Sequence, residues 1–278
     1  MKTLSINRIL VALDASAVNR SVLQAATTLA VNLDAELNAL FIEDINLLRL
    51  AELPFAREIV YGSDTGRGIN VADMERSMLM QTKRLRELVG TIAKQSRLRI
   101  AFDVERGDIA SAICHASRQT DLLIIGKNSQ LLRQSLKVGT IAQALLSSTH
   151  CNLMVLQHGA TIERPVVVTF DGSDVSLTAV LLASRLARQD HNVLIVLFPA
   201  VNDHRYQLLY NQLMKEITNT SLQIRPVRLS ENTVAQILQA IKQYQGRILL
   251  LETGCSFLTA DQTREIVMQA DIPVVLLR

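Results

Sequence analysis

Short apolar runs alternate along the chain with longer segments in which apolar residues return every third or fourth position. In the first half the apolar runs predict five strands: residues 8–14, 37–42, 98–104, 121–125 and 153–156. The segments of helical spacing between them predict three main helices: residues 18–32, 71–96 and 109–118. Because helices separate successive strands, we expect a parallel sheet with helices packed on its faces.

The same pattern begins again in the second half of the chain. Arg164 to Asp171 (RPVVVTFD) repeats the apolar run and terminal aspartate of Arg8 to Asp14. Further strands are expected at residues 193–198, 248–251 and 274–277, with a helix at residues 234–244. The sequence therefore predicts two copies of one α/β domain, residues 1–158 and 164–278, joined by a short linker.

A polar loop with a glycine near each end follows the fourth predicted strand. It runs from Gly126 to Thr140 (GKNSQLLRQSLKVGT) and leads into a segment with helical spacing. Glycine permits a ligand to approach the backbone closely, and the N–H groups at the start of a helix favour an anion. We interpret this loop as one that holds the phosphates of a nucleotide.

Composition narrows the classes of partner. The 278 residues carry a formal net charge of only +3, with 4% aromatic residues and no dense basic stripe, so no nucleic-acid surface is predicted. No apolar run approaches the roughly 20 residues that span a bilayer, so no membrane insertion is expected. Three widely spaced cysteines fit a reducing, cytoplasmic environment better than a disulfide framework.

Three short segments and the loop give the chain a family resemblance. The segments read ILVALDAS (9–16), RGDIASAI (106–113) and DLLIIGK (121–127). With the loop spacing, the chain resembles the universal stress protein family in its tandem two-domain form. The resemblance implies two Rossmann-like domains, each a doubly wound parallel five-stranded sheet of order 3-2-1-4-5. A ligand in such a sheet lies where the strand order reverses, between strands one and four.

The resemblance also implies which residues bind ATP or a related adenine nucleotide, with or without Mg²⁺, in the first domain. Asp14 would lie at the base and ribose, and the backbone of Ile42 at the adenine edge. The ribose and phosphates would be surrounded by Gly126, Ser129, Gly139 and Thr140. Ser129 departs from the family, which has a glycine there: its hydroxyl can donate to phosphate, but a positive φ would cost it on the order of 1 kcal/mol.

The second domain is expected to have lost this site. Glu252 aligns with Gly126, and the segment that follows is five residues shorter. Thr259 and Gln262 have capping-box spacing, and Asp261 adds a negative charge where phosphate would lie. We therefore expect no triphosphate nucleotide in this half, although Asp171 and Ser173 persist.

These expectations favour a stress-response regulator that binds a nucleotide in its first domain. A vacant tandem scaffold is the alternative that Ser129 favours, and a slow ATPase ranks last because no catalytic set is visible. Cys114-His115 and His150-Cys151 lack further ligands at usable spacing, so no metal site is predicted, and Cys151 and Cys255 are expected to be buried. We expect the two domains to pair through their fifth strands as an intrachain pseudo-dimer; a homodimer and an unknown protein partner remain open.

Overall fold

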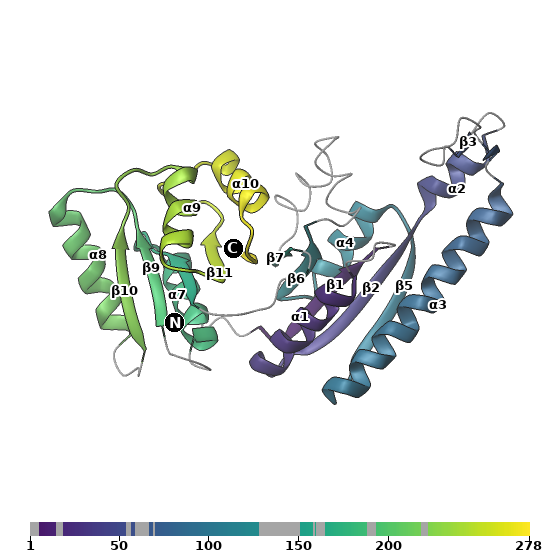
Figure 1. The fold of residues 1–278 in the computed structure, drawn as a ribbon, viewed down its shortest axis with the longest axis horizontal. Coiled ribbons are helices and arrows are strands. Elements are labelled where there is room, and N and C mark those ends of the chain that lie inside the picture. Colours follow the sequence, from purple (N-terminus) through teal and green to yellow (C-terminus); the bar gives the residue numbers. More distant parts are fainter. Residues whose placement is uncertain are drawn as a thin grey trace.

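One mixed sheet of ten strands runs through both halves of the chain in the computed structural model (Figure 1). The structure describes residues 6–14, 19–53, 57–58, 67–68, 70–127, 151–157, 159, 165–187, 193–217 and 222–278. The strand order across the sheet is β10-β9-β8-β11-β12-β7-β6-β1-β2-β5. The first half of the chain lies on the right of Figure 1 and the second half on the left.

The five strands that the first half contributes to this sheet are parallel to one another and follow the order expected from the sequence. They are β1 (Arg8–Leu13), β2 (Glu36–Asp44), β5 (Ile100–Gly107), β6 (Leu122–Gly126) and β7 (Asn152–Leu156). Their order is β5-β2-β1-β6-β7, which is 3-2-1-4-5. A separate pair, β3 (Arg57–Glu58) and β4 (Arg67–Gly68), lies outside this sheet and was not predicted.

The second half repeats this arrangement. Its strands are β8 (Val166–Thr169), β9 (Val193–Phe198), β10 (Gln223–Arg228), β11 (Ile248–Glu252) and β12 (Val274–Leu277). Their order, β10-β9-β8-β11-β12, is again 3-2-1-4-5, and neighbouring strands are parallel. The expected fold class, α/β with doubly wound five-stranded sheets, is confirmed.

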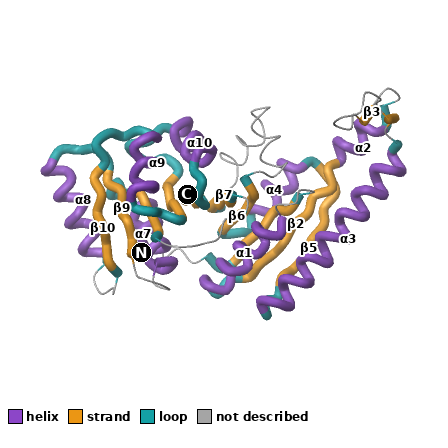
Figure 2. The backbone as a smooth tube through the Cα atoms, viewed as in Figure 1, coloured by secondary structure: helices purple, strands orange, loops and turns teal. Residues whose placement is uncertain are grey.

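Helices cover both faces of the sheet (Figure 2). One apolar core packs α1 (Asn19–Leu33), α3 (Val71–Ser96), α7 (Asp174–Ala187) and α8 (Asp203–Glu216) against one face. The other core packs α4 (Ile109–Ser117), α9 (Val234–Gln243) and α10 (Ala260–Gln269) against the opposite face. A short helix, α2 (Ile45–Ala51), follows β2 and contacts α3. Each core includes residues from both halves, so an apolar layer continues from one half to the other on each face of the sheet.

The long helix α3 has the bounds that the sequence predicts. Asn70 caps its start, with Oδ1 accepting from the N–H of Ala72 at 2.9 Å. Met78, Leu85 and Ile92, which keep the helical spacing of apolar residues in this segment, are buried in the core. Arg97 ends the helix with φ 55°, and this left-handed turn delays β5 to Ile100, two residues later than expected.

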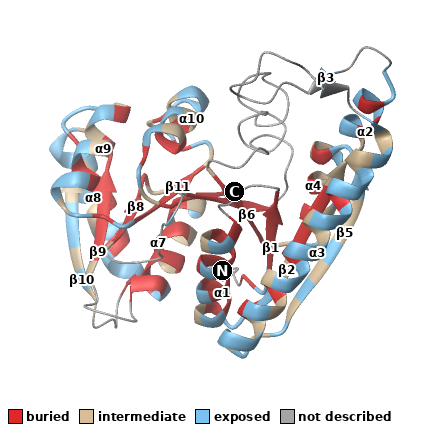
Figure 3. Cartoon of the chain, turned by 45° about the vertical axis from the view of Figure 1, so that its right-hand side comes forward, coloured by how far each residue is buried: buried red, intermediate tan, exposed pale blue. Residues whose placement is uncertain are grey.

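The two halves are joined by antiparallel pairing of their fifth strands. The register is Val274 with Val155, Val275 with Met154 and Leu276 with Leu153. This confirms the expected pairing of 153–156 with 274–277, and Figure 3 shows that these central strands are buried. Because the joint is antiparallel, the carboxyl ends of the strands lie on opposite edges of the sheet in the two halves.

Polar contacts reinforce the joint. Lys127 Nζ and Gln157 Nε2 both donate to the carbonyl oxygen of Ala270, at 2.7 and 2.9 Å. They link the carboxyl edge of the first half to the C-terminal end of α10. Among the described residues, no helix is long and apolar enough to cross a membrane.

Candidate functional site

Asp14 and Gly126 lie at the point where the strand order of the first half reverses. Asp14 directly follows β1, and Gly126 is the last residue of β6, the strand paired with β1. Continuing the register of Ile9 with Leu122 brings Leu13 level with Gly126. The two predicted site residues are therefore brought to one position at the carboxyl edge, where doubly wound sheets bind ligands.

The backbone at Asp14 is held by the first turn of α1. The N–H of Asp14 donates to Asn19 Oδ1 at 3.2 Å, and Asn19 Nδ2 donates back to the carbonyl oxygen of Asp14. Asp14 is only 5% exposed, although it is an acidic residue at the end of a strand. The local fold thus fixes the direction in which the chain leaves β1.

Ile42 lies one residue beyond the end of β1 on the neighbouring strand. The pairing of β1 with β2 ends at Leu13 with Phe41, whereas β2 continues to Asp44 alongside β5. Ile42 is buried with the apolar layer that α4 covers. The structure therefore places Ile42 at the same edge as Asp14 and Gly126.

The remaining predicted site residues, Ser129, Gly139 and Thr140, lie outside the described part of the chain. The described segment stops at Lys127, whose ammonium group donates to Ala270. Burial lowers the pKa of Lys127, and the nearby Asp271 partly opposes this. Lys127 is thus oriented toward the second half.

At the corresponding point of the second half, a buried polar cluster lies at the strand ends. Ser173 Oγ donates to Glu252 Oε2 at 2.7 Å, and the N–H of Ser173 donates to Asp171 Oδ1 at 2.9 Å. The N–H of Ser256 donates to Asp171 Oδ2 at 2.9 Å. The thiol of Cys255 lies close to both carboxyl groups. We refer to Asp171, Glu252 and Cys255 as the strand-end cluster.

Burial and proximity shift the pKa values of all three groups. Burial and the neighbouring Asp171 raise the pKa of Glu252 to about 7, although Ser173 opposes this. Burial alone would raise the pKa of Asp171, but hydrogen bonding with Glu252, Ser256 and Ser173 holds it well below its usual range. Burial also raises the pKa of the Cys255 thiol to about 12. One proton is therefore retained between the two carboxyl groups up to near-neutral pH.

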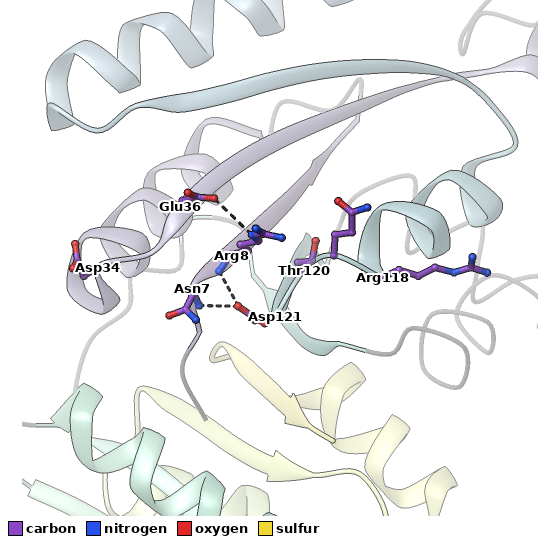
Figure 4. Close-up of a pocket in the computed structure, with 8 residues that line it drawn as sticks. Asn7, Arg8, Asp34, Glu36, Arg118, Thr120 and Asp121 are labelled. Carbon is purple, nitrogen blue, oxygen red and sulfur yellow. Dashed lines mark hydrogen bonds and ion pairs between the residues drawn. The ribbon is translucent and has the colours of Figure 1, made fainter. Parts of the chain in front are cut away.

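A third polar feature lies at the other end of the first half. A hollow of about 570 Å³ is lined by residues at the amino ends of β1, β2 and β6 (Figure 4). Asp121 Oδ2 accepts from the N–H groups of Asn7 and Arg8 at 2.8 and 2.9 Å, and Arg8 forms an exposed 3.8 Å ion pair with Glu36. These contacts hold the amino ends of β1, β2 and β6 together. The hollow therefore lies at the amino edge of the sheet, opposite the carboxyl edge that carries Asp14.

The family profile that matches this sequence is that of the universal stress protein family, over residues 5–157. The chain belongs to the universal stress protein family. The match covers the first half, including the strand ends that carry Asp14 and Gly126. No curated protein matches the sequence.

Solved structures extend the fold likeness of this universal stress protein family member to nearly the whole chain. A universal stress protein from Archaeoglobus fulgidus DSM 4304 is 14% identical, with a TM-score of 0.75 over 98% of this chain and 97% of its own. A putative universal stress protein from Pseudomonas aeruginosa UCBPP-PA14 is 14% identical, with a TM-score of 0.61 over 99% and 94%. A functionally unknown protein from Pseudomonas aeruginosa PAO1 is 13% identical, with a TM-score of 0.61 over 99% and 93%.

The strand registers place Glu252 in the second half where Gly126 lies in the first half of this universal stress protein family member. Ile248 pairs with Val166, so Glu252 is level with Phe170, the residue before Asp171. The predicted capping box is also present: Thr259 Oγ1 accepts from the N–H of Gln262, whose Oε1 accepts from the N–H of Thr259. The second half therefore fills its strand-end position with its own side chains.

The sequence interpretation missed that Cys255 joins Asp171 and Glu252. Cys255 was expected only to be buried, and it is. The available signal was a Glu252-x-x-Cys255 spacing directly after a strand, in a sheet whose first strand ends in Asp171. Because this spacing alone is weak, only the register of β8 with β11 brings the three side chains together.

The turn between Asp171 and α7 depends on Gly172. Its φ is 90°, and an added Cβ would lie 2.6 Å from Leu209 Cδ2 and 3.0 Å from Gln212 Oε1. We expect Gly172→Ala to lower the free energy of unfolding by about 2–4 kcal/mol, from the left-handed backbone and the forced shift of Leu209. Urea unfolding measures this.

The matched control is Gly254→Ala. Gly254 has φ 87°, and nothing lies within 4 Å of an added Cβ. The expected loss in the free energy of unfolding is therefore only the cost of a left-handed backbone at alanine, about 1–2 kcal/mol. Equal losses in the two variants would show that Leu209 imposes no additional constraint at Gly172.

Proposed function

We propose that this protein is a stress-response regulator that binds ATP or a related adenine nucleotide in its first half. The observation that carries the proposal is the meeting of Asp14 and Gly126 at the strand-order reversal, directly before the glycine-bounded loop. Membership of the universal stress protein family supports the regulatory role. The nucleotide would control which protein partner is bound.

The chemistry expected of each residue follows from its position. Gly126 ends β6 without a side chain, so no Cβ would keep a ribose or phosphate away from its backbone. Asp14 offers a carboxylate to ribose hydroxyls, and Ile42 offers backbone groups at the edge of the adenine ring. Ser129, Gly139 and Thr140 would contribute donors to the phosphates, and Mg²⁺, where present, would neutralise part of the phosphate charge.

Isothermal titration with ATP tests the proposal. We expect one nucleotide per chain, and Gly139→Val should abolish the binding heat because the β-branched side chain would fill the approach to the phosphates. Ser129→Gly, which restores the family residue, should bind at least as tightly as the natural chain.

The same substitution at Gly90 is the control. Gly90 lies within α3, and nothing lies within 4 Å of an added Cβ, so Gly90→Val should bind ATP normally. Two equivalent sites per chain would contradict the loss of the site in the second half. No binding heat from either the natural chain or Ser129→Gly would refute the proposal.

The alternative function is a tandem scaffold without a nucleotide. Ser129 favours it, as does the contact that directs Lys127 to Ala270. A scaffold would bind its partner equally well with and without ATP. An ATPase would release phosphate above the level of Gly139→Val, which separates it from a binding protein.

A further inference from the structure

The strand-end cluster brings three potential metal ligands together from two separate segments. One ligand atom each from Asp171, Glu252 and Cys255 lies within 4.8 Å of the other two. The residues are 7%, 3% and 3% exposed, respectively. The cluster therefore lies inside the fold, where the side chains cannot be solvated freely.

Two buried carboxylates need a proton or a cation to offset their charge, and no described basic side chain supplies it. In the part of the chain that the structure describes, no lysine, arginine or histidine forms an ion pair with Asp171 or Glu252. Glu252 Oε1 is buried and accepts no hydrogen bond from a described donor, although Oε2 accepts from Ser173. Because burying two uncompensated carboxylates costs about several kcal/mol, either a retained proton or a bound cation has to offset the second negative charge.

The carboxylates are already oriented by donors around the cluster. Both oxygens of Asp171 accept backbone N–H groups, from Ser173 and Ser256. Ser173 also caps the start of α7, with its Oγ accepting from the N–H of Ser176 at 3.0 Å. Such supporting hydrogen bonds fix ligand geometry and are typical of metal-binding carboxylates.

We propose that Asp171, Glu252 and Cys255 bind a divalent transition-metal ion, with Zn²⁺ as the best match. A thiolate excludes Mg²⁺ and Ca²⁺, which take oxygen ligands, while Zn²⁺ accepts carboxylate oxygen and sulfur together. Three protein ligands leave one tetrahedral position for water. The ion would tie the end of β8 to the segment between β11 and α10, which is a structural role independent of the nucleotide.

Cobalt substitution tests this directly. The full chain is stripped of metal with a chelator, dialysed and titrated with Co²⁺. We expect a thiolate-to-cobalt charge-transfer band in the near ultraviolet that saturates at one ion per chain and disappears when Zn²⁺ is added. Zn²⁺ should also raise the unfolding midpoint of the metal-free protein, because the site exists only in the folded chain.

Four variants make the result specific. Cys255→Ser should lose the band, whereas Cys151→Ser, at the other buried cysteine, should keep it. Glu252→Gln should weaken Co²⁺ binding at least about tenfold, and Ser173→Ala should weaken it by about ten- to hundredfold without changing the ligand set.

A bound proton is the competing account of the same cluster. If a shared proton alone satisfies Asp171 and Glu252, Co²⁺ produces no charge-transfer band and Zn²⁺ leaves the unfolding midpoint unchanged. That result overturns the proposal. A band retained in Cys255→Ser but lost in Cys151→Ser would also overturn it.

Discussion

Val275→Asp is expected to lower the free energy of unfolding by at least about 3 kcal/mol, because a carboxylate would be buried without a partner. Val275 is 3% exposed and forms the central pair of the joint with Met154, which is fully buried. Both side chains belong to the core that spans the two halves. Denaturant unfolding followed by circular dichroism measures the loss.

The joint also determines whether the halves unfold together. A charge at Val275 should separate one cooperative transition into two, since the three residue pairs of the joint carry the strand pairing between the halves. Val31→Asp provides the same substitution at a 55% exposed position of α1, where the loss should stay within about 1 kcal/mol. A comparable loss in both variants would contradict the importance of the joint.

In metal-free protein, stability is expected to fall as pH rises through about 7, the raised pKa of Glu252. Because burial and Asp171 raise this pKa from 4.5, the folded state binds a proton that the unfolded state has lost. The stabilisation of the folded state by the Glu252 proton is complete below the pKa of the unfolded chain, 4.5. It is lost as the pH rises to the folded-state pKa of about 7. Asp171 has the opposite effect, because its pKa is lowered from 3.8 in the folded state. Its ionised carboxylate stabilises the folded chain above pH 3.8, and this stabilisation is lost as the pH falls below that value.

The combined contribution of the two groups should therefore be greatest near pH 4, roughly, between the unfolded values of 3.8 for Asp171 and 4.5 for Glu252, and should decline as the pH rises towards 7. Denaturant unfolding in chelator at a series of pH values measures the profile. Glu252→Gln removes the titrating group, while the glutamine amide can still donate to Asp171. The stability of this variant should therefore not fall between about pH 6 and pH 8. A natural chain whose stability is flat through neutral pH would contradict the assigned proton.

The sequence predicted the buried elements well because apolar runs and helical spacing reflect burial directly. Val193–Phe198 and Val274–Leu277 have the bounds expected of them. β10 was not predicted, because it is an edge strand whose six residues are all exposed or half-buried and because it contains Pro226. The β3–β4 pair was missed because strands of two residues are too short to show an alternation of apolar and polar residues.

The candidate sites were predictable only where one residue defines a strand end. Asp14 and Gly126 were recognised as the ends of predicted strands, Ile42 was implied by the family resemblance, and the structure brings all three to one edge. The strand-end cluster depends on the register of β8 with β11, a contact between residues far apart in the chain. No local pattern encodes that register, so the approach of Cys255 to Asp171 became apparent only in three dimensions.

The joint between the halves also covers two strands that would otherwise be exposed sheet edges. All five residues of β7 and all four of β12 are buried. Each half made alone would present one of these apolar strands as an open edge, the condition under which sheets recruit strands from other chains. Covalent duplication gives each edge a permanent neighbour at a very high local concentration, so correct assembly does not depend on how much protein the cell makes.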